Sequence, residues 1–154
     1  MMYHLHKTEE CEKQGIHLIH IFEDEWLNKQ NIVKSELNKL LGNSKTIDSN
    51  ECSIEKISLK DKENFLENNC LQGNDSSNIT FGLKHNDKIV AIMSFMKARF
   101  SKKYEHEISR YATALNVTVL NGSQKLLNHF EKIYCPKSLV TYVNRRWNNG
   151  EMYF

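Results

Sequence analysis

The residues Asn121, Gly122 and Ser123 stand where a strand-like segment gives way to a helix-like one, and they could hold an anion. Residues 107–115 alternate apolar and polar side chains, and apolar residues at helical spacing follow from position 126. A helix start leaves backbone N–H groups unpaired, and a glycine lets a phosphate approach them closely. We therefore predict cofactor-binding residues here, with a plain turn and N-cap as the alternative.

Glu107 and Arg110 are the candidate charged groups of the strand-like segment. They lie three positions apart, so on a regular strand they would point to opposite faces and would not pair with each other. We predict that one of them is buried against a polar partner on the strand that carries Tyr142. An ordinary exposed pair is the alternative.

A cluster of four positive charges lies within seven residues that contain no acid. Such a cluster can bind phosphates, although a solvated turn would look the same in sequence. Two further arginines follow near the C-terminus. The predicted DNA contacts are Lys97, Arg99, Lys102, Lys103, Arg145 and Arg146.

Histidines and acidic residues near the N-terminus raise the question of a metal site. His17 and His20 are three apart in a strand-like run, so their side chains should point to opposite faces and cannot ligate one ion together. We predict no metal site, and we interpret the acidic residues 23–25 as a solvated strand end.

The composition limits the classes of function. A chain of 154 residues can bury one sizeable core, and 21 basic against 19 acidic residues give it a net charge of only +2. Any contact with nucleic acid must therefore come from a local patch. The four cysteines form no C-x-x-C pair, which argues against a zinc finger and for reduced thiols. No apolar run reaches membrane-spanning length, so we expect a cytoplasmic protein with no membrane partner.

The first part of the chain, residues 1–43, is predicted as helix, strand, helix. Residues 1–14 form the first helix, and residues 16–22 are the best candidate for a central buried strand. The second helix covers residues 29–41 with Asn28 as its cap. Glycines at positions 15 and 42 end the two helices.

The second part, residues 54–154, is predicted as an α/β unit after a polar linker at residues 44–53. The expected order is strand, helix, strand, strand, strand, helix, strand. The ranges are strand 54–59, helix 60–69, strands 79–84 and 88–96 joined by a tight hairpin, the strand in 107–115, the helix after 122 and strand 138–143.

The segment YHLHKTEECEKQGIHLIHIFEDEWLNKQNIVKSELNKLLG resembles the tail of the nuclease domain in phage homing endonucleases related to very-short-patch repair endonucleases. In those proteins the catalytic acidic residues lie upstream, on strands that this chain does not contain. Phosphodiester cleavage needs carboxylates that hold a divalent metal. The resemblance therefore implies a nuclease remnant without the nuclease site, and a separate nuclease subunit as a compatible partner.

Five further segments look like the C-terminal domain of the same endonucleases, and more distantly like the Mom proteins of phages. They are FLENNCLQG, GLKHNDKIVAIMSF, EISRYATALN, NGSQKLL and SLVTYVNRRWNNGEMYF. Mom proteins are GNAT-fold enzymes that modify adenine in DNA. The resemblance implies a GNAT-like mixed sheet with flanking helices and a cofactor such as an acyl-coenzyme A-like nucleotide. The implied catalytic residues are Cys70, Glu107, Arg110, Tyr142 and Asn144.

The chain departs from the pattern of these proteins, which have a histidine at the place of Cys70 and an aspartate at that of Asn144. Both changes would weaken proton transfer or metal binding if those groups served it. The chain also ends before the closing strand that the resemblance leads us to expect, so we expect a domain truncated at its C-terminus. Two hypotheses follow: a phage or mobile-element transferase that modifies DNA bases, or a non-catalytic DNA-binding module of a split or decayed homing endonuclease.

Overall fold

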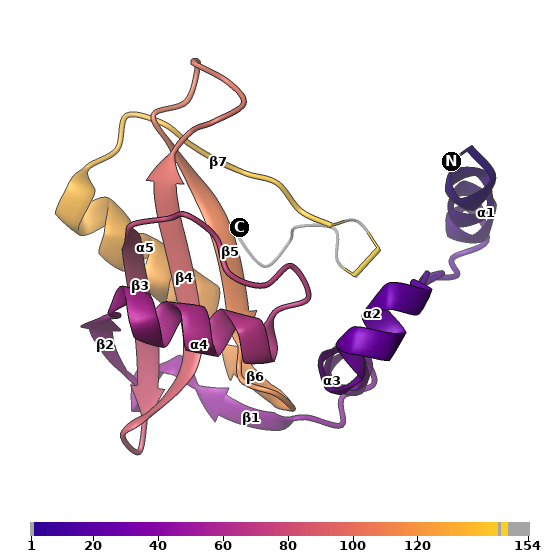
Figure 1. Cartoon of the computed structure of the whole chain (residues 1–154), viewed down its shortest axis with the longest axis horizontal. Coiled ribbons are helices and arrows are strands. Elements are labelled where there is room, and N and C mark those ends of the chain that lie inside the picture. Colours follow the sequence, from indigo (N-terminus) through magenta and orange to yellow (C-terminus); the bar gives the residue numbers. More distant parts are fainter. Residues whose placement is uncertain (1, 145, 148–154) are drawn as a thin grey trace.

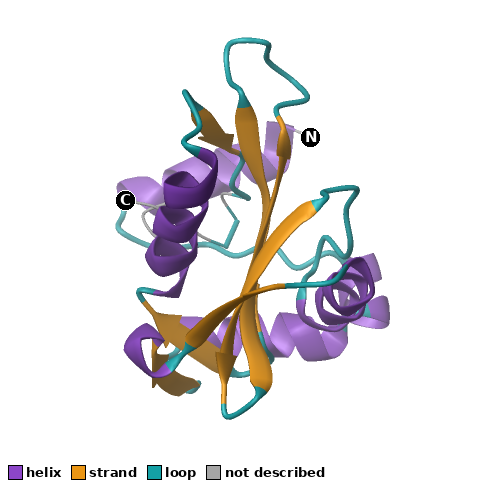
Figure 2. Cartoon of the chain, turned by 90° about the vertical axis from the view of Figure 1, so that its left-hand side faces the viewer, coloured by secondary structure: helices purple, strands orange, loops and turns teal. Residues whose placement is uncertain are grey.

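A five-stranded sheet with one helix on each face forms the body of the protein (Figures 1 and 2). The computed structural model describes residues 2–144, 146 and 147. In chain order the elements are α1 (Met2–Lys13), α2 (Glu23–Asn28), α3 (Gln30–Leu40), β1 (Lys45–Asp48), a 3₁₀ turn (Ser49–Glu51), β2 (Ser53–Lys56), α4 (Leu59–Asn69), β3 (Ile79–His85), β4 (Lys88–Lys97), β5 (His106–Thr113), β6 (Val117–Leu120), α5 (Gly122–Tyr134) and β7 (Leu139–Thr141).

The strand order in the sheet is β2-β3-β4-β5-β7. The first four strands are antiparallel neighbours, whereas β7 runs parallel to β5 because α5 carries the chain back between them. A separate parallel pair, β1 with β6, lies at the end of the molecule where β5 leads into β6 (Figure 1). The protein therefore belongs to the α/β class that the sequence predicts, with a mixed and mostly antiparallel sheet.

The two faces of the sheet have separate apolar cores. Leu126, Leu127 and Phe130 of α5 are buried on one face, where the Phe130 ring stacks on Phe95 with centroids 3.8 Å apart. On the other face α4 buries Phe65 and Leu66, which belong to the same apolar cluster as Ile92 and Ala112 of the sheet and Ile57, the residue after β2. Buried side chains at helical spacing, positions 126, 127 and 130 of α5 and 62, 65 and 66 of α4, produce this one-sided burial.

Two local signals in the second part of the chain are confirmed. The expected helix at 60–69 is α4, and the expected hairpin joins β3 to β4. Its two turn residues, Asn86 and Asp87, have φ values of 50° and 60°, as a tight hairpin with a right-handed twist requires.

The predicted strand at residues 16–22 is wrong. The segment is a connection between α1 and α2 that pairs with no strand among the described residues, and Ile16, Ile21 and Phe22 are exposed. A run of strand-forming residues becomes a strand only where a neighbouring strand edge is free to pair with it. The short strands β1 and β6 pair with each other and not with this segment. The predicted cap Asn28 is also displaced by one residue, because the N-cap of α3 is Lys29.

The polar stretch predicted as a linker, residues 44–53, contains β1, which pairs in parallel with β6. Ile47, its only large apolar residue, is buried together with Val119 of β6. The expected order of elements has no strand between residues 115 and 122, so β6, which makes this pairing possible, was not predicted.

The helix α3 packs on the body of the protein, whereas α1 lies apart from the sheet (Figure 1). Ile32 and Val33 are buried, and the hydroxyl of the fully buried Ser35 accepts a 2.7 Å hydrogen bond from the backbone N–H of Asn116. None of the helices in the described part of the chain combines the length and the apolar character needed to cross a membrane.

Candidate functional site

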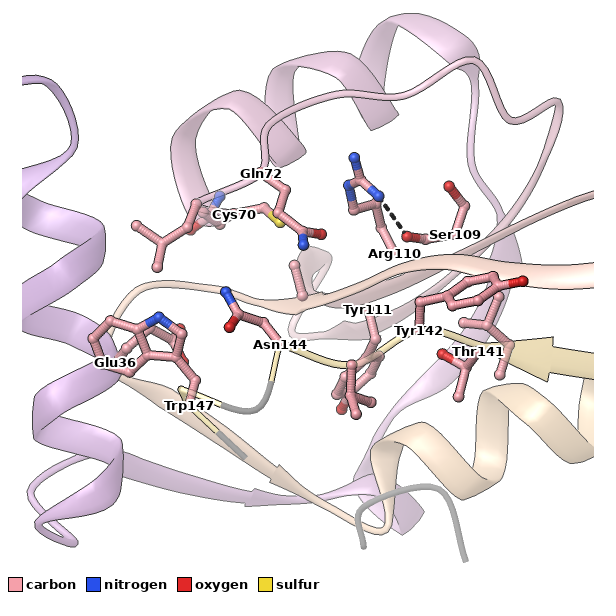
Figure 3. A pocket seen from close by; sticks show the side chains of 15 residues that line it. Glu36, Cys70, Gln72, Ser109, Arg110, Tyr111, Thr141, Tyr142, Asn144 and Trp147 are labelled. Carbon is pink, nitrogen blue, oxygen red and sulfur yellow. Dashed lines mark hydrogen bonds between the residues drawn. The ribbon is translucent and has the colours of Figure 1, made fainter. Parts of the chain in front are cut away.

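A pocket of about 130 Å³ opens where β5 and β7 separate (Figure 3). The two strands pair from His106 with Leu139 to Ile108 with Thr141, and beyond that point each continues along a different side of the pocket. Residues after Asn69 and one residue of α3 complete the walls. The lining residues are Glu36, Asn69, Cys70, Leu71, Gln72, Ile108, Ser109, Arg110, Tyr111, Ala112, Thr141, Tyr142, Val143, Asn144 and Trp147.

Four of the five predicted catalytic residues meet in this pocket: Cys70, Arg110, Tyr142 and Asn144. They come from three segments, namely the end of α4, β5 and the chain after β7, which are far apart in sequence. Figure 3 shows the thiol of Cys70 and the amide of Asn144 on the same side of the pocket. Glu107, the fifth predicted residue, does not line it.

A β-bulge turns Arg110 toward the pocket. The register between β4 and β5 shifts between Ser94, which faces Arg110, and Phe95, which faces Ile108, so Ser109 is the extra residue. Without the bulge, Ile108 and Ala112 would share a face, yet they lie in opposite cores. Glu107 and Arg110 therefore share a face, and the prediction that they point to opposite sides is wrong.

Arg110 presents a guanidinium group that is only partly occupied by the protein. Its Nη1 donates a 2.7 Å hydrogen bond to the carbonyl of Ser109, and its Nε donates a long 3.4 Å bond to that of Gly73. Among the described residues no hydrogen bond from Nη2 is found. Arginine offers its donors in a fixed planar arrangement, so the remaining N–H groups can bind an oxygen of a ligand.

Cys70 contributes a neutral thiol. Burial raises the pKa of Cys70 and outweighs the nearby positive charges of Arg110 and Lys29. A protonated thiol is a poor nucleophile but can donate a weak hydrogen bond. Asn144 adds an amide whose Oδ1 accepts hydrogen bonds from the backbone N–H and the Nε of Arg146, at 3.2 and 3.3 Å.

The sequence analysis missed three lining residues that could contact a ligand, Gln72, Ser109 and Trp147. The indole of Trp147 is 8% exposed, and its Nε1 has no hydrogen-bond partner among the described residues. A buried indole N–H without an acceptor is costly, so this donor is suited to a ligand oxygen or nitrogen. The only signal in the sequence was an isolated tryptophan beside two arginines.

A buried ion pair fixes the loop after α4 that forms one wall of the pocket. Lys62 donates to the Oδ1 and the carbonyl of Asp75, at 3.0 and 2.8 Å, and to the carbonyl of Ser77 at 2.7 Å. Both charged side chains are 3% exposed. Burial alone would raise the pKa of Asp75, but the neighbouring hydroxyls of Ser109 and Ser77 and the ammonium group of Lys62 hold it well below its usual value.

Glu107 is buried, as one of the pair was predicted to be, but its partner is Arg99 rather than a residue of the strand that carries Tyr142. The carboxylate accepts the backbone N–H of Arg99 at 2.9 Å and its Nε at 2.8 Å. Glu107 is 1% exposed and the Arg99 side chain 43%. Glu107 thus attaches the β4–β5 connection to the sheet, and Arg99 is an ion-pair partner as well as a predicted DNA contact.

Gly122 begins α5 in a crowded place. A Cβ built on it would lie 2.9 Å from Cγ1 of Val119 and 3.0 Å from the hydroxyl of Tyr111, a residue that lines the pocket. The missing side chain therefore makes room for protein atoms, so that only the backbone N–H groups of this turn remain for a phosphate. Asn121 precedes it with a φ of 56°.

The second predicted basic segment is engaged within the protein in its described part. Arg146 binds both carboxylate oxygens of Glu25, at 3.0 and 2.7 Å, and the carbonyl of His20 at 2.9 Å. The hydrogen bonds from Arg146 also lower the pKa of Glu25. Arg145 lies outside the described residues. In the described part of the chain no group of three or more metal-ligating side chains occurs, and the histidines near the N-terminus do not form one.

Comparison of the chain with family models, with curated proteins and with solved structures finds no match. The function must therefore be argued from the pocket and the surface around it. Chemically, the pocket offers hydrogen-bond donors from Arg110 and Trp147, amides from Gln72 and Asn144, and a neutral thiol. Such a set can hold a carbonyl or a small polar ring, and its one carboxylate, Glu36, is paired with Lys39.

Proposed function

We propose that this protein is a group transferase with a GNAT-like core that modifies DNA bases, and that the pocket between β5 and β7 is its reaction site. The observation that carries the proposal is the meeting of Cys70, Arg110, Tyr142 and Asn144 at the point where two parallel strands separate. In a GNAT-like domain this separation is where the donor is held. In this chain α5 follows β5 and leads into the parallel strand β7, which is the crossover connection that such a domain has at this place.

The resemblance to Mom proteins of phages remains part of this proposal. The pocket is smaller than the roughly 300–1,000 Å³ typical of sites for whole ligands, so it suits the reacting group of a larger donor or a single base. The donor is proposed to be an acyl-coenzyme A-like nucleotide. Its phosphates would lie near residues 121–123, next to Tyr111.

Calorimetry with acetyl-coenzyme A tests the donor site. Wild type should bind it, and Arg110→Ala should bind about 10- to 100-fold more weakly, because a hydrogen bond to a charged group contributes about 1.5–3 kcal/mol. Lys88→Ala removes an exposed positive charge at the other end of the sheet and serves as the control. No heat from the wild-type protein would count against the donor site.

A second candidate function is DNA binding without turnover. It is favoured by the chemistry of the pocket, where Cys70 is a neutral thiol and Asn144 cannot transfer a proton. Under this alternative the protein binds DNA but does not modify its bases. Adding acetyl-coenzyme A, or mutating a residue of the pocket, would then leave the base composition of the DNA unchanged.

A further inference from the structure

An exposed aromatic pair stands at the mouth of the pocket. Phe100, in the connection between β4 and β5, is 75% exposed, and its ring meets Tyr142 edge to face with centroids 5.5 Å apart. Tyr142 also lines the pocket. Exposed aromatic faces are costly in water, but unpaired nucleic-acid bases stack on them favourably.

Positive charges surround this pair. Lys102 and Lys103 are exposed on the same connection, and Lys97 is exposed at the end of β4. The guanidinium of Arg99 lies 5.4 Å from the centre of the Phe100 ring. In Figure 1 the connection projects past the end of the sheet, beside the segment that leads into β7. The two acids here are already engaged: Glu107 with Arg99, and Glu105 with the backbone N–H of residue 137 at 2.7 Å.

The surface is held in place rather than left to move freely. Glu107 binds both the backbone and the side chain of Arg99, which fixes the residue immediately before Phe100. Glu105 and Ser138 join the far end of the connection to the start of β7, with a 2.9 Å bond from the Glu105 N–H to the Ser138 hydroxyl. A fixed aromatic face loses less conformational entropy when a ligand binds.

We propose that Phe100, Tyr142, Lys97, Lys102 and Lys103, together called the aromatic-basic surface, bind a single strand of nucleic acid. The lysines bind phosphates, one base stacks on Phe100, and the neighbouring base is directed toward the pocket. In a duplex the base faces are already covered by stacking, so an aromatic ring gains little there. A membrane surface fits less well, because Phe100 is the only purely hydrocarbon side chain among the five residues of this surface. The inference deepens the proposed function by naming the state of the DNA that the site takes.

Fluorescence anisotropy with a labelled oligonucleotide of about 12 nucleotides tests this, since single-strand binders cover roughly 4–16. Phe100→Ala should weaken binding about 5- to 100-fold, as expected for one lost stacking contact, without changing the salt dependence. The double variant Lys102→Ala, Lys103→Ala should reduce the salt slope by about 1.4, because each phosphate contact on a single strand contributes about 0.7. Tyr3→Ala is the matched control, since Tyr3 is 65% exposed beside Lys7.

Preference for either a DNA or an RNA strand over the duplex of the same sequence supports the proposal. Equal affinity for the duplex, unchanged binding by Phe100→Ala, or binding to anionic phosphatidylserine vesicles that Phe100→Ala abolishes would each overturn it. The assay needs neither a donor nor turnover. The single-strand binding could therefore be observed even if the protein is not a transferase. Likewise, a lack of single-strand binding would not disprove the transferase proposal.

Discussion

Cys70 lies in the pocket as a thiol whose pKa is raised, chiefly by burial. Alkylation requires the thiolate, so Cys70 should react with iodoacetamide more slowly than the exposed Cys135, and its rate should keep rising above the pH range of an ordinary thiol. Variants that retain one of the two cysteines allow each rate to be measured by mass spectrometry. A rate for Cys70 equal to or above that of Cys135 at neutral pH would contradict the assignment.

Lys62 and Asp75 form the buried ion pair behind the pocket wall. Lys62→Met should lower the free energy of unfolding in urea by about 3–5 kcal/mol, because it leaves a buried carboxylate without its cation. Lys60→Met, an exposed change on the same helix, should stay within about 0.5 kcal/mol. Because the pKa of Asp75 is lowered in the folded state, its contribution is complete at neutral pH and is lost as the pH falls below the ordinary carboxyl range. Similar unfolding free energies for both variants would show that the pair is unimportant.

At the scale of the elements, the start of α5 is a tightly packed junction. Gly122→Ala places a Cβ within 3.0 Å of Val119 and of the Tyr111 hydroxyl, so we expect a loss of about 1–3 kcal/mol in unfolding free energy from overpacking. Asn121→Gly, at a left-handed φ of 56°, should change the unfolding free energy by less than about 0.5 kcal/mol, since the relief of strain offsets the added chain entropy. A Gly122→Ala variant as stable as wild type would mean that this junction can relax.

The elements that local patterns predict are those whose partners are near in sequence. The hairpin at Asn86 and Asp87 and the helix α4 each follow from a short stretch of residues. The pairing of β1 with β6 joins segments about 70 residues apart. β1 is short and polar, and β6, although rich in strand formers, has only four residues, so neither segment shows its partner in the sequence.

The residues of the candidate site were predicted only in part. The four predicted residues in the pocket were named from a resemblance rather than from spacing, and the bulge at Ser109 that turns Arg110 leaves no clear mark in sequence. Trp147 lies in the chain after β7 and Gln72 in the loop after α4. Both line the pocket only because of how these segments are placed in the fold, which the sequence does not show.

At the scale of the whole molecule, the N-terminal segments are joined to the body through α3 and Arg146. Arg146→Ala removes both bonds to Glu25 and the bond to the His20 carbonyl. We expect backbone amides in residues 16–28 to exchange hydrogen about tenfold faster, as the loss of about 1.4 kcal/mol of local stability implies. The pKa of Glu25 is lowered chiefly by Arg146, so the same loosening should occur in wild type when the pH falls below the ordinary carboxyl range. Unchanged exchange in the variant would mean that this link does not hold the segment.

The position of α3 also joins the N-terminal segments to the site. Glu36 of α3 lines the pocket, and Lys29 donates a 2.9 Å hydrogen bond to the carbonyl of Leu71 in its wall. Residues 1–43 therefore contribute one side chain to the wall of the proposed transferase pocket and support the loop after α4.

Nucleoside mass spectrometry tests the central claim, that the β5–β7 pocket modifies DNA bases, most directly. DNA from bacterial cells that express the wild-type chain is digested to nucleosides and compared with DNA from cells that express Arg110→Ala at the same level. A nucleoside of increased mass is expected with wild type, and it should be strongly reduced or absent with the variant. Identical nucleoside profiles in the two samples, with both proteins folded and bound to DNA, would contradict it and leave DNA binding without turnover as the function.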